Sequence, residues 1–389
     1  MTDALDLHLS DAHRELYERT RSLAADTLVP IAAQGEPGRV NRPLVAALAE
    51  SGLLDRLFAS GQVSAIELCL IREALARECT EAETAFALQG LGAYPIVQAG
   101  SASVRDAWIP RVASGAAVAA FALTEPEAGS DPAALTLRAE PNSDPAHPGG
   151  YRLTGEKLWI SNAPDADIYA VFARTADAGG RGARGLTAFA VPGDAPGLNG
   201  SPRELLAPHA IGSLTFDGVP VPADHVLGEP GGGFRVAMRT LDLFRPSVGA
   251  FAIGMARTAL QLATGYALQR RTFGVPLAEH QAPAHRLADL RAQTEAARLL
   301  VHQAALAHDA GRPDPSVAAM AKLLATEVAQ AAVDAAVQLH GAVALERGHP
   351  LEHLYREVRA PRIYEGASEI QREIIARAMF RAAAGRAAP

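Results

Sequence analysis

The sequence predicts an α+β protein that is mainly α, in which a β domain lies between two helical regions. Two observations support this: both ends of the chain carry long segments with apolar residues at helical spacing, and the middle carries short β-like runs between turn-rich stretches. The chain has 389 residues, which is enough for two or three domains with sizeable cores. We expect three domains, over residues 1–118, 119–225 and 226–389.

The first of these regions is predicted to be helical throughout. Ser10 can cap a helix that runs to about Leu28, and Pro30 is a stop signal for that helix. Residues 67–100 carry an unbroken series of apolar positions at helical spacing. Residues 53–67, which lie between these segments, form only a short connection.

The middle region changes to short runs rich in β-formers. These β-like runs lie at 119–124, 135–140, 151–155, 168–173, 186–191 and 213–218. Turn-rich stretches separate them, and the basic segment at 180–185 is expected to be a solvated loop. The pattern predicts a β domain of several strands.

The last region returns to long helices. A glycine run at 231–233 opens it, and a long apolar helix follows in which Pro246 should produce a kink. Residues 280–311 and 315–341 form two more long helical patterns, so the region reads as a bundle.

The final helix begins beside an acidic turn. Ile370 and Ile374 recur at helical spacing, and Ser368 with Gln371 forms a capping box that places the helix start at Ser368. Glu365 then lies in the turn just before the helix, between a tyrosine and a glycine. An acid in such an apolar setting can have a raised pKa and act as a base, whereas a lone glutamate at this place is usually a surface residue.

The composition argues against several classes of protein. The chain is 49% hydrophobic and 20% charged, as globular domains are, and its formal net charge of −7 argues against nucleic acid or an anionic membrane as the main partner. Cys69 and Cys79 give neither a disulfide framework nor a metal-ligand spacing. Residues 1–20 contain acids and no long apolar run, and no segment has about 18 uninterrupted apolar residues, so we expect a soluble, cytoplasmic protein without membrane contact.

Four segments occur in the order and at roughly the spacing of one known family. They are FALTEPEAGS (121–130), EKLWISN (156–162), RRTFG (270–274) and RIYEGASEIQREIIAR (362–377). Together they resemble the acyl-CoA dehydrogenase family, and the resemblance covers nearly the whole chain. It implies an N-terminal helical domain, a middle β-barrel or β-sandwich domain and a C-terminal four-helix-type bundle.

The resemblance also implies a function. It is that of an FAD-dependent acyl-CoA dehydrogenase that passes electrons to an electron-transfer flavoprotein and assembles as a homotetramer, a dimer of dimers. In the family the glutamate of the YEG turn is commonly the base that removes the substrate α-proton, which here assigns that role to Glu365. A base is needed because the α-carbon of an acyl thioester is weakly acidic, and a cofactor is needed because no side chain accepts the β-hydride.

Carried over by motif match, the resemblance assigns many residues to FAD. Thr124 and Ser130 would hydrogen-bond to the flavin, Ser161 would lie near its N5 and Trp159 would shield one face, while the arginines of RRTFG would reach the pyrophosphate of a neighbouring subunit. The full set is Phe121, Leu123, Thr124, Gly129, Ser130, Trp159, Ile160, Ser161, Arg270, Arg271, Thr272, Phe273, His280, Gln281, Gln338, Leu339, His340, Gly341, Ala342, Ala367, Ser368 and Glu369.

The substrate residues implied by the resemblance are Ser130, Asp242, Arg245 and Gly366. Asp242 would meet the pantetheine amide and Arg245 would lie close to Glu365. Two departures from the family pattern concern the cofactor. Ala342 and Ala344 stand where many relatives have glycine, and Ala367 stands where many have threonine, which removes one hydroxyl contact.

Structural alternatives stay open for several of these residues. Trp159 could belong to the core, the paired arginines could form a solvated helix end, and His340 could be a packed or capping histidine. Asp242 and Arg245 could form a surface ion pair of a few tenths of a kcal/mol. Ser130 could simply sit in a turn.

Two alternative functions also stay open. One is different chemistry on the same scaffold: an oxidase, a desulfinase, a flavin monooxygenase or a dehydrogenase of carrier-protein-linked acyl groups. The other is a helical assembly protein without activity.

The residues of one predicted helix indicate the size of the acyl group. In the family the helix that corresponds to residues 83–98 lines the acyl end of the cavity, and here it carries Phe86, Gln89, Tyr94 and Gln98. Rings and amides shorten a pocket, and an unpaired buried amide would penalise a long alkyl tail. We therefore expect a short, branched or cyclic acyl-CoA, unless these side chains face the other side of the helix.

Overall fold

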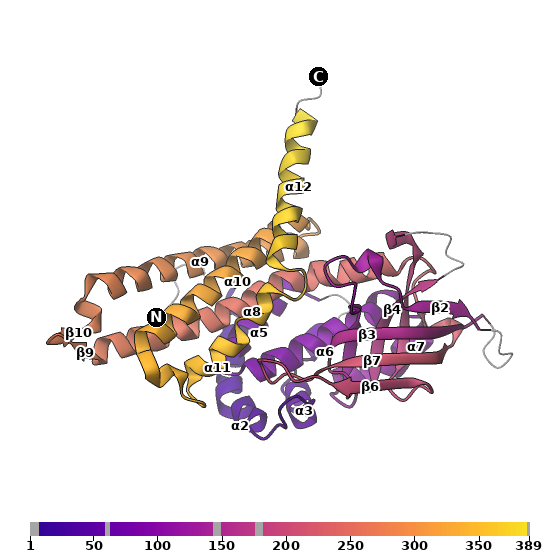
Figure 1. Ribbon diagram of the computed structural model, residues 1–389, viewed down its shortest axis with the longest axis horizontal. Helices are drawn as coiled ribbons and strands as arrows, with labels where there is room; N and C mark the ends of the chain where they lie inside the picture. Colours follow the sequence, from indigo (N-terminus) through magenta and orange to yellow (C-terminus); the bar gives the residue numbers. More distant parts are fainter. Residues whose placement is uncertain (1–7, 59–62, 143–148, 176–181, 387–389) are drawn as a thin grey trace. The chain divides into compact units, whose positions relative to one another are not determined.

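The computed structural model describes residues 8–58, 63–142, 149–175 and 182–386, with side chains described as far as residue 384 (Figure 1). The expectations for the connection at 53–67 and for the basic segment at 180–185 fall partly outside these residues. By contacts the chain divides into two compact units. The helical unit comprises Met1–Val29, Ser64–Glu83 and Asp242–Pro389, and the sheet unit comprises Pro30–Val63 and Thr84–Leu241. The three-domain division at 118 and 225 stays a prediction.

The sheet unit is built on eight described strands. They are β1 (Ala119–Ala122), β2 (Arg138–Pro141), β3 (Tyr151–Ser161), β4 (Ile168–Thr175), β5 (Leu186–Pro192), β6 (Leu198–Pro202), β7 (Ile211–Val221) and β8 (Val226–Leu227). The strand order is β6-β7-β3-β2-β4-β5-β8, with β1 paired to β4 beside this path. β1 and β2 run parallel to β4, and the other described pairs are antiparallel.

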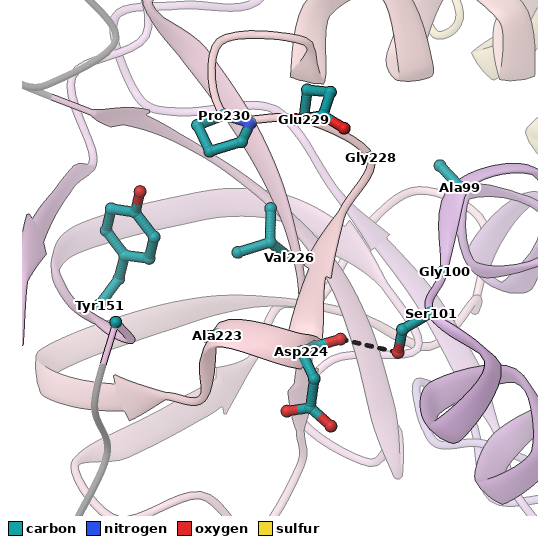
Figure 2. Close-up of a pocket in the computed structure, with 11 residues that line it drawn as sticks. Ala99, Gly100, Ser101, Tyr151, Ala223, Asp224, Val226, Gly228, Glu229 and Pro230 are labelled. Atoms are coloured by element: carbon teal, nitrogen blue, oxygen red, sulfur yellow. Dashed lines mark hydrogen bonds between the residues drawn. The ribbon is translucent and has the colours of Figure 1, made fainter.

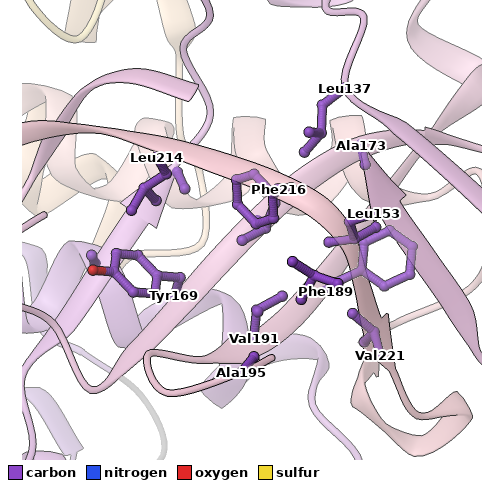
Figure 3. Close-up of a cluster of buried hydrophobic side chains, with 14 of the residues drawn as sticks. Leu137, Leu153, Tyr169, Ala173, Phe189, Val191, Ala195, Leu214, Phe216 and Val221 are labelled. Atoms are coloured by element: carbon purple, nitrogen blue, oxygen red, sulfur yellow. The ribbon is translucent and has the colours of Figure 1, made fainter. Parts of the chain in front are cut away.

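Strand β4 is buried on both faces because two cores meet on it. Tyr169, Val171 and Ala173 point into a core formed by the sheet itself (Figure 3). The alternate residues, Ile168 and Phe172 among them, pack into a second core together with residues of helices that follow or precede the sheet. A strand that alternates between two apolar cores reads as a continuous hydrophobic run, which is why IYAVFA was recognisable in the sequence.

Helices cover the second core within the sheet unit. They are α7 (Ala102–Ala113), the part of α6 (Thr80–Ala99) from Thr84 onward, and the first turns of α8 (Gly233–Gln269). Two shorter helices, α3 (Arg42–Glu50) and α4 (Asp55–Phe58), complete the described part of this unit.

Two strands of the sheet unit were not predicted. β6 has the sequence LNGSP and is mostly exposed, so it carries no apolar alternation that could mark it as a strand. β8 is only two residues long. Conversely, β3 continues beyond the predicted 151–155 as far as Ser161, so the EKLWISN segment lies on a strand and the turn that follows it.

The helical unit contains the long helices expected at the end of the chain. They are α9 (Gln281–Asp309), α10 (Pro315–His340), α11 (Pro350–Glu357), α12 (Ser368–Arg386) and the part of α8 from Asp242, which continues through Pro246. The helical unit also includes elements from the first part of the chain: α1 (Asp11–Leu23), the π-helical stretch η1 (Ala24–Leu28) and α5 (Ala65–Glu78). α9 and α10 lie side by side, and the end of α12 projects past them (Figure 1).

The predicted start of the first helix is confirmed, and its predicted end is wrong. The Ser10 hydroxyl accepts the His13 N–H at 3.2 Å, as an N-cap does. Helical turns nevertheless continue past Pro30, in the short helix α2 (Val29–Ala32). The helical run is continuous from Asp11 to Ala32, and the π-helical stretch η1 ends directly before Val29 and Pro30, so the regular i→i−4 bonding pattern is already interrupted where the proline lies.

A buried carboxylate ties the helices of this unit together. Glu73 of α5 is 0% exposed and accepts hydrogen bonds from Arg257 of α8 at 2.7 Å, from Arg298 of α9 at 2.9 Å and from Tyr17 of α1 at 3.0 Å. Burial alone would raise the pKa of Glu73, but Arg298 and Arg257 hold it well below its usual value. One ionised side chain thus connects four helices.

One helix passes a length and composition test for crossing a membrane. It is α10 with the residues after it as far as Leu345. In the structure α10 packs against α9, α11 and α12, and it carries the buried polar residues Lys322 and Thr326. These are the contacts of a core helix in a helical bundle.

Candidate active site

The turn that precedes α12 has a strained backbone. Glu365 has φ of 51° and Gly366 has φ of 94°, so two successive residues occupy the left-handed region. For glutamate this conformation costs on the order of 1–3 kcal/mol, and it persists only where the surroundings enforce it. Strain of this kind is frequent at sites that must aim a particular side chain.

Two buried side chains fix this turn through one carbonyl. Lys322 Nζ of α10 donates to Gly366 O at 2.7 Å, and Gln371 Nε2 of α12 donates to the same oxygen at 2.8 Å. Lys322 and Gln371 are each 0% exposed. A carbonyl that accepts from an ammonium and an amide is held more firmly than one neutral hydrogen bond could hold it.

The helix start at Ser368 is confirmed, but the capping box is wrong. The Ser368 hydroxyl donates to Glu327 Oε1 at 2.7 Å instead of accepting from the Gln371 N–H, which is bonded to Ala367 O. The Gln371 amide reaches back to the turn, as described above. Glu327 also pairs with Arg362 at 2.9 Å, and this competing acceptor explains the different role of Ser368.

Burial and nearby positive charges have opposite effects on the pKa of the Glu365 carboxyl group. Its Oε2 atom is buried and has no hydrogen-bond partner. Burial raises the pKa of Glu365, and the positive charges of Arg72, Arg245 and Lys322 offset only part of that rise. A carboxylate with an unpaired oxygen and increased basicity can take a proton from a bound molecule.

Arg72 and Glu83 form a buried ion pair in the same region. Arg72 Nε of α5 donates to Glu83 Oε1, and Arg72 Nη1 donates to Ser247 Oγ at 2.6 Å. The side chains of the pair are 4% and 1% exposed. Neither residue was predicted from the sequence, although two charged residues so close to apolar helical runs were a usable signal.

Arg245 is not part of a surface ion pair. It is 6% exposed, and its Nη1 donates to Asp242 Oδ1 at 3.1 Å while its buried Nε has no partner. Asp242 keeps 39% of its side chain exposed. The alternative of a solvated i,i+3 pair therefore fails for Arg245, whose charge acts on Glu365.

The first two motifs lie side by side in the sheet unit. The Leu158 N–H donates to Thr124 O at 3.0 Å. Lys157 Nζ donates to Leu123 O at 2.8 Å and to Glu125 Oε1 at 2.8 Å. The two segments are thereby fixed to each other through a buried ion pair.

Trp159 belongs to the surface and Ile160 to the core. Trp159 has φ of 60° and is 49% exposed, so the alternative that it is a core residue is wrong. Ile160 is 1% exposed and packs in the core of the sheet, which leaves only its backbone available to a ligand. Ser161 is half-buried beside them.

The RRTFG motif forms the tip of a hairpin. Its strands are β9 (Arg271–Thr272) and β10 (Val275–Pro276), joined at Phe273 and Gly274 with φ of 52° and 86°. Two positive φ angles are what a tight two-residue hairpin turn requires. Phe273 is 98% exposed, and its ring stands edge-on to His280 with the ring centroids 6.2 Å apart, which leaves nearly all of it open.

The residues at the end of α10 present an open glycine beside a packed histidine. His340 is stacked on Tyr266 with ring centroids 4.2 Å apart, and its Nδ1 lies 2.7 Å from Ala336 O, as the packed alternative requires. Gly341 has φ of 70°, and no atom lies within 4 Å of where a Cβ would stand. Ala342 is exposed.

The structure distributes the predicted residues over both units. In the sheet unit lie Phe121, Leu123, Thr124, Gly129, Ser130, Trp159, Ile160 and Ser161. In the helical unit lie Asp242, Arg245, Arg270, Arg271, Thr272, Phe273, His280, Gln281, Gln338, Leu339, His340, Gly341, Ala342, Glu365, Gly366, Ala367, Ser368 and Glu369.

These surfaces suit the flavin dinucleotide that the motifs imply. An exposed indole at Trp159 offers a face for a ring system, and the exposed Arg270 and Arg271 offer forked donors for phosphate. The space beside Gly129 and Gly341 is open, so a cofactor can come close to the protein backbone at these two glycines. When bound, FAD supplies an acceptor for hydride.

The expectation of an unpaired amide near the acyl group is wrong. Gln89 is 0% exposed, but its Nε2 donates to Ala117 O at 2.9 Å and its Oε1 accepts from the Ala119 N–H at 2.8 Å. Gln98 Nε2 donates to Val236 O at 3.0 Å and to Thr240 Oγ1 at 2.7 Å. Both amides serve the structure of the sheet unit.

A pocket of about 470 Å³ in the sheet unit lies apart from the predicted residues (Figure 2). It is lined by loop residues around Ser101, Asp224 and Glu229, and Ser101 Oγ donates to Asp224 O at 2.8 Å. None of the predicted site residues lines it, and its charged side chains are acids without a cation among them.

Comparison with known proteins assigns all three parts of the chain to one family. Residues 10–116, 120–219 and 231–380 match the N-terminal, middle and C-terminal domains of acyl-CoA dehydrogenases. The cyclohexane-1-carbonyl-CoA dehydrogenase of Geobacter metallireducens is 33% identical over 384 residues, which is 96% of this chain and 99% of that protein.

Solved structures agree with this assignment. Butyryl-CoA dehydrogenase from Megasphaera elsdenii is 32% identical with a TM-score of 0.88, covering 96% of this chain and 99% of its own. A chain in a structure of the electron-transferring flavoprotein of Acidaminococcus fermentans is 30% identical with a TM-score of 0.89, covering 97% and 100%. PigA in complex with FAD is 26% identical with a TM-score of 0.87, covering 95% and 98%. The chain therefore belongs to the acyl-CoA dehydrogenase family, the FAD-dependent oxidoreductases that act on acyl-CoA.

Proposed function

We propose that this protein dehydrogenates a short, branched or cyclic acyl-CoA to the 2,3-enoyl-CoA, with Glu365 as the base. The proposal rests chiefly on the carboxyl group of Glu365, whose buried Oε2 has no hydrogen-bond partner and whose pKa is raised by burial. In the reaction the Cα–H bond breaks and its proton goes to Glu365. FAD, when bound, would supply the acceptor for the β-hydrogen and its electron pair, so that the Cα–Cβ double bond could form.

The other residues of the turn and of α8 prepare this step. Arg245 and Lys322 place positive charge close to where negative charge develops on the thioester oxygen. The backbone N–H groups of the Glu365 turn are fixed through Gly366 O, so they can donate to the same oxygen without rearrangement. Asp242, with 39% of its side chain exposed, remains available to an amide of the CoA arm.

The substrate class is supported by relatives. The names of two similar proteins state activity toward cyclohexane-1-carbonyl-CoA and butyryl-CoA. Neither acyl group is long, and one is cyclic. We propose the same size class here, with Phe86, which is 0% exposed, reducing the space available.

The remaining parts of the proposal concern partners and location. Electrons pass to an electron-transfer flavoprotein, which agrees with the similar chain found in a structure of such a flavoprotein. The chain forms a homotetramer, in which the exposed Phe273 hairpin contacts a neighbouring subunit, and it acts in the cytoplasm.

The test is anaerobic bleaching of the bound flavin. Butyryl-, isobutyryl-, cyclohexanecarbonyl-, octanoyl- and palmitoyl-CoA are compared by the rate constant of bleaching divided by the dissociation constant. The proposal requires the maximum among the first three. A maximum at octanoyl or longer refutes the size class, and rapid oxygen consumption without a flavoprotein acceptor identifies an oxidase instead.

A further inference from the structure

Lysine is used at only two positions of this chain. Lysines and arginines together number 36, but only Lys157 and Lys322 are lysines, so every other such cation is an arginine. Both lysines are 0% exposed. A chain that uses arginine everywhere else keeps lysine at two positions where water is excluded. These two positions therefore favour a compact ammonium over a planar guanidinium.

At position 322 the ammonium is hydrogen-bonded directly to the strained turn. Its Nζ donates to Gly366 O at 2.7 Å, which is the carbonyl directly after Glu365. The groups whose charges act on it come from four elements: Glu365 of the turn, Arg245 of α8, Glu327 of α10 and Glu369 of α12. Three of these are acids, and Glu365 has the largest effect among them.

The turn needs such a fastening. A left-handed Glu365 costs on the order of 1–3 kcal/mol, and it is followed by a glycine that is also left-handed. The surrounding contacts must offset this strain energy. Two of them are hydrogen bonds to Gly366 O, one from a charged donor and one from a neutral donor. The charged donor is worth about twice a neutral one in such a buried setting.

We propose that Lys322 is a positioning residue of the dehydrogenation, which locks the Glu365 turn through the Gly366 carbonyl and adds its positive charge to those of Arg72 and Arg245 around Glu365. The inference rests on the proposed function of Glu365. Lys322 itself touches neither the acyl group nor the cofactor in this role. It acts through the turn and through its charge.

Two variants separate the two parts of this role. Lys322→Met keeps an apolar stem of similar length and removes the ammonium. Gln371→Met removes the neutral donor to the same carbonyl and leaves the charge. Both are measured as FAD-loaded enzyme, by exchange of the acyl α-hydrogens of butyryl-CoA with D₂O in the absence of an electron acceptor, between pH 5 and 10.

The expected results differ in the pH profile. Lys322→Met slows exchange by about 100-fold, because a displaced base loses about that much, while the dissociation constant of butyryl-CoA and the FAD content stay within about threefold of wild type. The acid limb, which is the part of the pH–rate profile where the exchange rate falls as Glu365 becomes protonated, moves to higher pH in this variant. The reason is that Glu365 has lost a cation that lowers its pKa. Gln371→Met slows exchange with the acid limb unmoved.

A wild-type measurement keeps the inference testable if Lys322→Met does not fold. Burial lowers the pKa of Lys322 to about 8, against the raising effect of Glu365. Exchange by the wild-type enzyme should therefore decline as the pH rises through about 8. A rate that stays level to pH 10 would overturn the proposal.

Other outcomes are equally decisive. Lys322→Met exchanging at a rate close to wild type, or losing exchange with the acid limb unmoved, would reduce Lys322 to a structural residue. If wild-type enzyme exchanges no α-hydrogen from any acyl-CoA, the proposed function of Glu365 fails. If wild type exchanges and Lys322→Met matches it, only the inference fails.

Discussion

Lys157 Nζ lies 2.8 Å from Glu125 Oε1, and the two side chains are 0% and 4% exposed. Glu125 also accepts the Thr136 N–H at 2.5 Å and the Leu137 N–H at 2.9 Å, while Lys157 donates to Leu123 O. This ion pair therefore joins the two segments that carry Thr124 and Trp159, and it fixes their separation before any cofactor binds.

Lys157→Met should destabilise the sheet unit and lower its flavin content. Removing one partner leaves the other charge buried and unpaired, which typically costs about 3–5 kcal/mol. Thermal unfolding followed by circular dichroism measures the first effect, and flavin absorbance per chain measures the second. The double variant Lys157→Met with Glu125→Met should recover part of the stability, because no isolated charge remains. A single variant as stable as wild type would contradict this.

Acid should weaken the helical unit through Glu73. Burial acts to raise its pKa, but Arg298 and Arg257 hold that pKa well below 4.5, so the unfolded chain binds this proton more readily than the folded one. The resulting stability is fully present above the unfolded value of about 4.3 and is lost as the pH falls below it. Urea unfolding at pH 7, 5, 4 and 3 measures the loss.

Glu73→Gln provides the control for the acid measurement. The variant should be less stable than wild type at pH 7, because the positive charges of Arg257 and Arg298 lose their counter-charge. Its stability should change less between pH 5 and 3. Equal acid sensitivity in both proteins would move the effect to other carboxylates.

Glu365→Gln should abolish flavin bleaching and leave the fold intact. General base catalysis contributes about 10²–10⁴-fold, and here the removal of the α-proton requires a base. Stopped-flow absorbance under anaerobic conditions gives the rate. Glu373→Gln is the matched control, since this carboxylate lies on α12 with 58% of its side chain exposed and pairs with the exposed Arg377 one turn away. Bleaching near the wild-type rate in Glu365→Gln would place the base elsewhere.

Gly366→Ala should slow catalysis by disturbing the turn. Gly366 has φ of 94°, and a Cβ there would stand 2.5 Å from Gln371 Nε2. Both the strain and the displaced amide weaken the hold on Glu365, so we expect kcat to fall by about 10²-fold. The control is Gly265→Ala within α8, where a Cβ meets nothing within 4 Å. That change should be neutral or stabilise by about 1 kcal/mol, and a similar loss of kcat in both variants would refute the argument.

Phe273→Ser should impair assembly without unfolding the subunit. The ring is 98% exposed at a left-handed turn that a polar residue tolerates as well, so its loss removes little packing within the described part of the subunit. The edge-on contact with His280 is lost within the subunit, and if the hairpin also completes a neighbour's site, the variant loses flavin and dissociates. Light scattering with flavin quantification tests this, and Leu206→Ser, at a residue 60% exposed in the sheet unit, is the control. A tetramer with full flavin in Phe273→Ser would exclude the hairpin from the interface.

Patterns repeated along the chain were predictable from sequence. The helices with continuous apolar stripes and the strands that alternate between two cores were identified, as were the helix starts at Ser10 and Ser368. Edge elements were missed, because β6 buries almost nothing and so leaves no hydrophobic pattern. The end of the first helix was predicted wrongly at Pro30, because the π-helical stretch η1 just before this proline cannot be recognised from the sequence pattern.

The site was predictable only where a motif is local. Glu365 and Gly366 are adjacent in the chain, and so were found together. Arg72 acts on Glu365 through its charge, and Lys322 donates a hydrogen bond to Gly366 O. These residues lie on helices about 293 and 43 positions before Glu365, so no local spacing in the sequence reveals the interactions. The Ser368 pairing failed for the same reason, since Glu327 reaches it from another helix.

The burial of both lysines also limits how readily acyl thioesters can modify this protein. Acyl thioesters transfer their acyl group to free amines, and an unprotonated ε-amino group is the usual protein acceptor. Here neither ε-amino group is exposed, and arginine supplies the other cationic side chains apart from histidine. An amine-directed reagent can therefore reach Lys322 only when α10 and the turn separate. The rate of its modification would report how often the Glu365 turn opens.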